Sequence, residues 1–225
     1  MKPRKITARR VGIGGFALAG LCLAVLQSLP APYLQATTGT IVSYHLWNFL
    51  SEYVRTQYAP LMATCFFCLA VGTLSAAFLL RHLRREAVLL MIAGVALLLL
   101  ICFPTDLADM TTDAVTCGQP DRIEPCTLTG RIHNQLSTVV FAPIFLVVFS
   151  VCARSRQETR WRGAARFAVV CGAFALCGII VSTFYLHTLG WQGRVWTGLL
   201  QRSLVFPALL WMVGLLMTNR ENPTV

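Results

Sequence analysis

Long unbroken runs of apolar residues constrain this chain more than any other feature of its sequence. Six such runs occur, each close to the ~20 residues that an α-helix needs to cross a bilayer. Apolar residues make up 56% of the chain and charged residues only 12%, about half the charged fraction of a typical soluble domain. The sequence therefore predicts an all-α, polytopic transmembrane bundle of six helices, with residues 1–225 forming a single domain.

The predicted spans follow the apolar runs along the chain. They cover residues 11–29, 59–80, 87–103, 136–153, 167–186 and 198–218. The first run also has the layout of a cleavable secretory signal, with a basic start and small residues after its apolar core, but we expect it to remain as a span. Small residues at helical spacing predict close approach of neighbouring helices at three pairs: Gly15 with Ala19, Gly20 with Ala24, and Ala173 with Cys177.

The connections between spans alternate in charge, which predicts the direction of each span. Most Lys and Arg residues lie in "MKPRKITARR", "RHLRRE", "RSRQETRWRGAAR" and "NRENPTV". Basic residues favour the cytoplasmic side, so both termini are predicted to be cytoplasmic, and residues 44–58, 104–135 and 187–197 to face outward. The net charge of +10 is explained by these short loops, and we expect no nucleic-acid partner.

Side chains capable of chemistry gather at the outward helix ends. Ser51, Glu52 and Tyr58 precede the second span, and Asp106 follows the third in "FPTD". The fourth span opens with His133 and Asn134, and the sixth carries Gln201 and Arg202 near its outer end. An ionisable group at membrane depth is costly unless it is paired, so we expect Glu52 or Asp106 beside Arg202. These residues predict an outward-facing polar pocket.

Two interpretations of this polar layer remain open. In the first, Asp106, His133 and Glu52 supply general acid and base, while Arg202, Gln201, Ser51, Asn134 and Tyr58 bind a substrate. In the second, the layer is structural, because polar residues are common at membrane interfaces and an Arg–carboxylate pair clamps helices together.

Metal and cofactor sites have little support in the sequence. Glu52, Asp106, His133 and His187 are residue types that bind zinc, but no close metal-binding spacing occurs, so a zinc site would have to be assembled across helices. We therefore assign no metal ligand, and no cofactor is indicated.

The cysteines suggest a third possible function. Cys117 and Cys126 bracket a short outward segment and predict a disulfide that holds the loop over the polar layer. Cys65 and Cys68 in "CFFC" have redox-pair spacing, but lie in an apolar span without a cation to lower the pKa of either thiol. We interpret this second pair as helix filler, with a thiol–disulfide oxidoreductase kept as an alternative.

The outward helix ends also resemble a family of six-span membrane proteins of bacteria and archaea, the domain of unknown function 998 family, which is loosely similar to Frag/DRAM/Sfk-type membrane proteins. The resemblance covers nearly the whole chain and rests on "LSEYVRTQYAPLM", "FPTD", "IHN" and "GLLQR". The family pattern often has Glu before the last Arg, where this sequence has Gln201. The resemblance implies a six-span fold and a membrane location. It does not indicate what activity the protein has.

These observations lead to one preferred function and its alternatives. We expect a multi-pass protein of a bacterial inner membrane that contacts membrane lipids and handles a lipid or isoprenoid substrate at the polar pocket. A non-catalytic lipid-binding or assembly subunit fits the same features. Whether the protein is an enzyme, and which oligomer it forms, is not indicated by the sequence.

Overall fold

Six long helices dominate the computed structural model, which describes residues 3–29, 50–105, 111–112, 115–116, 127–188 and 197–218. All six are long and apolar enough to cross a membrane, which confirms the predicted six-helix fold. They are α1 (Pro3–Ser28), α3 (Ala59–Leu79), α4 (Arg84–Cys102), α5 (Leu128–Arg154), α6 (Arg162–Thr188) and α7 (Thr197–Thr218).

Four short elements accompany the helices. Two are 3-10 helices, η2 (Leu50–Arg55) before α3 and η3 (Thr159–Trp161) before α6. The other two are the strands β1 (Thr111–Thr112) and β2 (Val115–Thr116), which form a small antiparallel ribbon with Thr111 opposite Thr116.

The start of α5 differs from the predicted span at 136–153. Thr127 has an extended backbone, and its hydroxyl accepts a hydrogen bond from the N–H of Gly130 at 3.0 Å. A threonine in this position satisfies one of the free N–H groups of the first turn, so the helix begins at Leu128. His133 therefore lies inside α5 rather than at its first residue.

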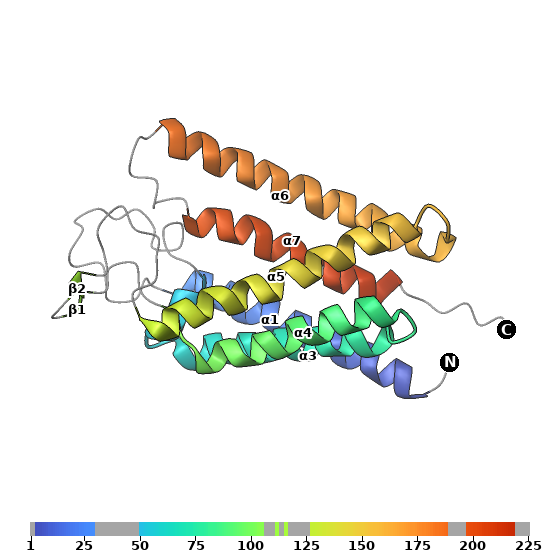
Figure 1. The fold of residues 1–225 in the computed structure, drawn as a ribbon, viewed down its shortest axis with the longest axis horizontal. Helices are drawn as coiled ribbons and strands as arrows, with labels where there is room; N and C mark the ends of the chain where they lie inside the picture. Colours follow the sequence, from blue (N-terminus) through green and yellow to red (C-terminus); the bar gives the residue numbers. More distant parts are fainter. Residues whose placement is uncertain are drawn as a thin grey trace.

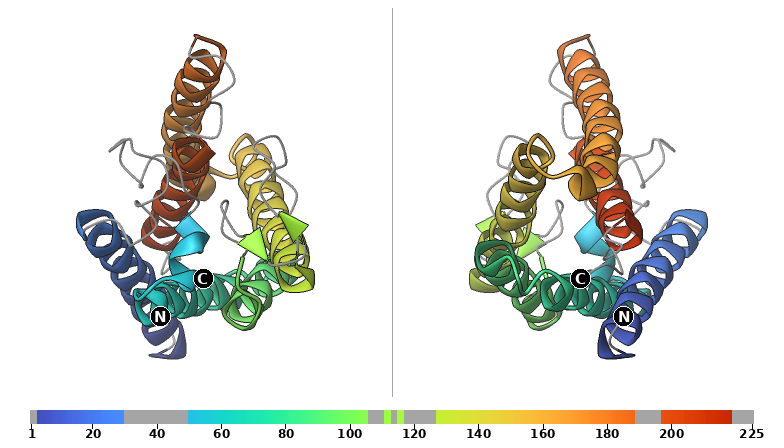
Figure 2. Two further views of the ribbon diagram at one scale, coloured as in Figure 1. Left: turned by 90° about the vertical axis from the view of Figure 1, so that its left-hand side faces the viewer. Right: turned by 90° about the vertical axis from the view of Figure 1, so that its right-hand side faces the viewer.

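The helices run alternately up and down, so that α1 begins and α7 ends at the same end of the bundle (Figure 1). We call this the terminal end and the opposite one, where η2 lies, the loop end. The closest packing joins α1 with α3, α3 with α4, α4 with α5, and α6 with α7, while α1 also contacts α7. Viewed along the bundle, α6 lies outermost beside α7 (Figure 2).

Glycines allow several of these helices to approach closely. A Cβ atom placed on Gly15 of α1 would lie 2.8 Å from the carbonyl oxygen of Cys68 in α3, so α1 and α3 are nearly in backbone contact. Gly94 of α4 likewise faces Leu74 of α3. The close approach predicted from Ala173 and Cys177 is wrong, because both side chains are exposed on α6 and no neighbouring helix covers them.

The terminal half of the bundle is filled by large side chains. The following are less than 2% exposed and pack there: Trp161, Trp211, Leu80, Leu90, Val147, Leu215 and Leu216. The loop half is packed differently, because an elongated cavity separates its helices.

Candidate functional site

The cavity extends from the loop end toward the middle of the bundle and encloses about 730 Å³, including the space at its opening. Its walls come from α1, η2, α3, α4, α5 and α7. Along three helices the lining residues run over 62–73, 133–144 and 201–212, and each stretch rises about 16 Å at ~1.5 Å per residue. The cavity is therefore long and narrow, and parallel to the helices.

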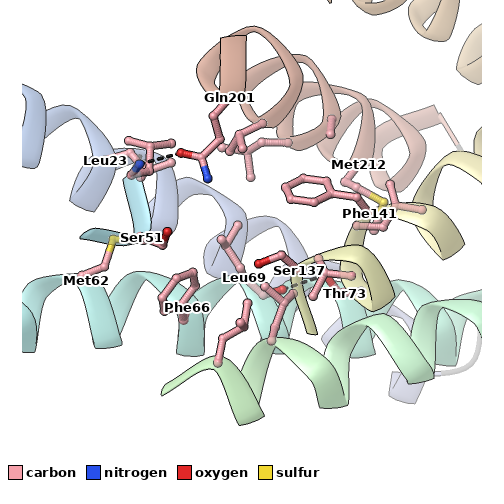
Figure 3. Close-up of a pocket in the computed structure, with 18 of the residues that line it drawn as sticks. Leu23, Ser51, Met62, Phe66, Leu69, Thr73, Ser137, Phe141, Gln201 and Met212 are labelled. Atoms are coloured by element: carbon pink, nitrogen blue, oxygen red, sulfur yellow. Dashed lines mark hydrogen bonds between the residues drawn. The ribbon is translucent and has the colours of Figure 1, made fainter. Parts of the chain in front are cut away.

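Most of the cavity surface is hydrocarbon. Its apolar lining comes largely from Phe16, Leu23, Met62, Phe66, Leu69, Leu97, Leu100, Val140, Phe141, Ile144, Val205, Leu209 and Met212. Ser51 and Gln201 lie at one end of the close-up, and Phe141 and Met212 lie together at the other (Figure 3). Hydroxyl groups extend inward at Ser137 and Thr73, and that of Thr73 is bonded to the carbonyl of Leu69 in its own helix at 2.8 Å.

Three polar residues that the sequence places near the membrane surface, Ser51, His133 and Gln201, line the loop end of the cavity. Gln201 ties η2 to α7, because its side-chain oxygen accepts a hydrogen bond from the backbone N–H of Leu50. Leu50 and Ser51 are both buried, so η2 covers this end of the cavity.

The imidazole of His133 has a defined orientation. It is 2% exposed, and its Nδ1 lies 2.7 Å from the carbonyl oxygen of Phe103, the residue directly after α4. Because a carbonyl only accepts hydrogen bonds, Nδ1 carries the proton, and in the neutral ring Nε2 is then an acceptor. The ring also meets Phe66 edge-on, with 6.5 Å between centroids.

Arg202 does not line the cavity and lies beside it in a buried polar cluster with Gln27 and Tyr53. Its Nε donates to the side-chain oxygen of Gln27 at 2.9 Å, which joins α7 to α1. Burial raises the pKa of the Tyr53 hydroxyl to about 12, although the positive charge of Arg202 and hydrogen bonds with Gln27 and Arg202 act in the opposite direction. Tyr53 is therefore neutral at ordinary pH and anchors η2 against both helices.

The remaining residues predicted for the site either lie away from the cavity or fall outside the described part of the structure. Asn134 is exposed, and Tyr58 is half-buried at the start of α3 with its ring 6.3 Å from that of Tyr53; neither lines the cavity. Glu52 lies in η2, but its side chain, like that of His187, lies outside the described part of the structure. Asp106, Cys117 and Cys126 are outside the described residues altogether, so the catalytic set and the loop disulfide stay predictions.

The seven described cysteines all carry free thiols. Cys65 is fully buried between α3 and α1, where its Sγ lies 3.7 Å from the carbonyl oxygen of Ala19, and Cys68 is buried nearby. Both therefore pack as small apolar side chains in the described structure.

Sequence reasoning missed a second polar cluster, at the terminal end. The carboxylate of Glu86 accepts hydrogen bonds from Ser150 and from Arg154 Nε, so α4 is tied to α5. Arg154 also approaches Glu158 at 3.9 Å, and Glu158 bonds Arg160 and the indole N–H of Trp161. The sequence did hold a signal for this cluster, because Glu86 and Arg154 both lie at the inner ends of predicted spans and carry opposite charges.

The comparisons with known proteins give one match. Residues 22–218 match the family described as "Protein of unknown function (DUF998)". Neither the curated proteins nor the solved structures contain a significant match to the chain.

Proposed function

The chain belongs to the DUF998 family of proteins of unknown function, and from its cavity we propose that this multi-pass membrane protein binds a lipid by a single hydrocarbon chain. The observation that carries the proposal is the combination of a long apolar cavity with polar side chains at one end only: Ser51, His133 and Gln201. An amphipathic lipid has the same division between a hydrocarbon chain and a polar head.

The dimensions of the cavity support a chain lying along the helices. Its lining rises about 16 Å, which is close to half the ~30 Å hydrocarbon thickness of a bilayer. A bound chain would thus lie at the depth of one leaflet, with its head at the membrane surface.

The shape of the cavity favours one chain over two. Its lining side chains come from six elements and include the rings of Phe16, Phe66 and Phe141, so the channel between them is narrow. We therefore propose that one prenyl or acyl chain lies in it, rather than the paired chains of an ordinary phospholipid. The proposed ligand class is therefore a prenyl lipid or a single-chain acyl lipid.

The polar end of the cavity suits a head group that accepts and donates hydrogen bonds. Ser51 and Gln201 offer hydroxyl and amide groups, and His133 offers an imidazole whose tautomer is set by Phe103. We propose that these residues bind the head, and that His133 acts as general base if the lipid is chemically altered. A non-catalytic lipid-binding subunit uses the same cavity, and turnover of the bound lipid distinguishes the two.

The orientation of the protein is part of the proposal. The terminal end carries many of the basic residues of the described helices, among them Arg9, Arg10, Arg81, Arg84, Arg85, Arg156, Arg162 and Arg166. Basic residues favour the cytoplasmic side, so we place both termini there and the cavity in the outer leaflet of a bacterial inner membrane. No described contact favours the thiol–disulfide alternative.

The test compares lipids that copurify with three forms of the protein. Ser137 lines the cavity, and its neighbour Thr138 is exposed on the same helix, so Ser137→Phe fills the cavity and Thr138→Phe is the matched control. Mass spectrometry of lipid extracts should show a single-chain or prenyl lipid enriched in the wild type and the control and depleted in Ser137→Phe. Lipid in bulk membrane proportions in all three forms would overturn the proposal.

A further inference from the structure

We propose that the lipid reaches the cavity sideways from the bilayer, through the seam between α5 and α7; this inference rests on the proposed function. These two helices supply opposite walls of the cavity: His133, Ser137 and Phe141 on α5, and Gln201, Val205 and Ala208 on α7. The two helices make little contact with each other along their described lengths, because α5 packs mainly on α4, and α7 on α6 and α1. Figure 2 shows α5 standing apart from the α6–α7 pair.

The other seams around the cavity are closed by specific contacts. Gly15 and Gly72 bring α1 against α3, and Gly94 brings α4 against α3. Between α4 and α5 the closure is polar, with His133 bonded to Phe103 at the loop end and Glu86 bonded to Ser150 at the terminal end.

The seam between α1 and α7 is held closed near both of its ends. The guanidinium of Arg9 donates to the carbonyl oxygen of Met217 at 2.6 Å near the terminal end, and Arg202 bonds Gln27 near the loop end. The loop end of the cavity itself is covered by η2 and fixed by the Gln201–Leu50 hydrogen bond. The α5–α7 side is thus the wall where the described packing is weakest.

Helical geometry identifies which residue of α5 and which residue of α7 border this seam. Successive residues of an α-helix point about 100° apart, so the lining face of α7 has two edges. Leu209 and Arg202 lie on the edge toward α1, since Leu209 lies 3.9 Å from the Cβ position of Gly20 and Arg202 bonds Gln27. Ala208 then lies on the opposite edge, toward α5. By the same geometry Phe141 lies on the edge of α5 that is turned away from α4.

Phe141 and Ala208, which border the seam, are both only half-buried, as expected where the wall of the cavity meets the surrounding lipid. Phe141 is large and packs beside Met212 within the cavity (Figure 3), whereas Ala208 is small. A bulky side chain at 208 would narrow the seam, and a small one at 141 would widen it. The two substitutions therefore act in opposite directions on the same path.

The experiment measures how fast a probe reaches the cavity in the full-length protein in lipid vesicles. The probe is hexadecanol with a diazirine in its chain, added to the vesicles and photolysed after increasing times. Adducts on peptides that line the cavity are quantified by mass spectrometry. We expect Ala208→Phe to slow labelling about tenfold and Phe141→Ala to accelerate it by a similar factor.

Two control substitutions change the same residue types away from the seam. Ala173→Phe is made on the exposed surface of α6, and Phe149→Ala at a side chain of α5 that is 69% exposed. If the cavity peptides are labelled in the seam variants at the same rate as in the controls, the sideways path is wrong. Lipid binding in the cavity would then still stand. No labelling of cavity peptides in the wild type would instead overturn the proposed function.

Discussion

The carboxylate of Glu86 in α4 lies 3.1 Å from Nη2 of Arg154 in α5, and the two side chains are 3% and 36% exposed. Glu86 is therefore almost sealed from solvent, while Arg154 reaches the surface. Ser150 donates a further hydrogen bond to the same carboxylate oxygen. This pair fixes the terminal end of α4 against α5.

The unequal exposure predicts unequal effects of removing each partner. Arg154→Ala leaves a buried carboxylate without its cation, and we expect a loss of about 1–3 kcal/mol in unfolding free energy. Glu86→Gln keeps an acceptor for Ser150 and leaves Arg154 in contact with water, so its cost should stay below about 1 kcal/mol. Thermal unfolding in detergent measures the stability of both variants. A larger loss for Glu86→Gln than for Arg154→Ala would contradict the burial of the Glu86 carboxylate.

The contact between α1 and α3 predicts opposite outcomes for two adjacent glycines. A Cβ on Gly15 meets the Cys68 carbonyl at 2.8 Å and the Gly72 nitrogen at 3.1 Å, and backbone atoms cannot rotate aside. Gly15→Ala should therefore push the helices apart and cost about 1–3 kcal/mol. Gly14 has nothing within 4 Å of its Cβ position, so Gly14→Ala should be neutral or stabilising. Equal melting temperatures of the two variants would refute the close approach.

The hydrogen bond between His133 and Phe103 predicts a stabilising role for the imidazole besides its place in the cavity. His133→Phe removes the donor to the carbonyl of Phe103, a half-buried residue directly after α4, and should cost about 1–3 kcal/mol. His133→Gln retains an N–H donor and should recover part of the loss. Asn134→Ala changes an exposed neighbour and serves as the control. If both His133 variants melt with the wild type, the hydrogen bond contributes little to the fold.

The sequence was sufficient for the six helices because length and apolar content alone decide whether a segment spans a bilayer. It also indicated that Ser51, His133 and Gln201 lie near one depth, since each is close to the outer end of a predicted span. Of the small-residue pairs, Gly15 with Ala19 lies at a close helix contact, and Gly20 meets only the side chain of Leu209 at 3.9 Å.

What the sequence did not predict depends on how each helix is rotated about its axis. Gln201 and Arg202 are adjacent, yet one lines the cavity and the other turns about 100° away toward Gln27 in α1. The apolar cavity itself had no sequence signal, because its walls are ordinary Leu, Val and Phe residues of membrane helices. The cavity lies where α5 and α7 make little contact with each other, since α5 packs mainly on α4, and α7 on α6 and α1.

The burial of Tyr53 predicts how the stability of the loop end depends on pH. The pKa of its hydroxyl is about 12 in the folded protein, against the usual 10.0 of an exposed tyrosine. Between these values the folded state retains a proton that the unfolded state has released. Stability therefore falls as pH rises from about 10 to about 12, and this tyrosine contributes no such dependence below that range.

Tyr53→Phe isolates this effect. At pH 8 the variant should be less stable by about 1 kcal/mol, because the hydroxyl's hydrogen bonds with Gln27 and Arg202 are lost. As pH rises toward 12, the wild type loses the stability linked to the retained proton and the variant does not, so the difference should shrink. Melting temperatures of both forms across alkaline buffers measure it. A difference that stays constant or widens would show that Tyr53 ionises as an exposed tyrosine does, and that η2 does not bury it between α1 and α7.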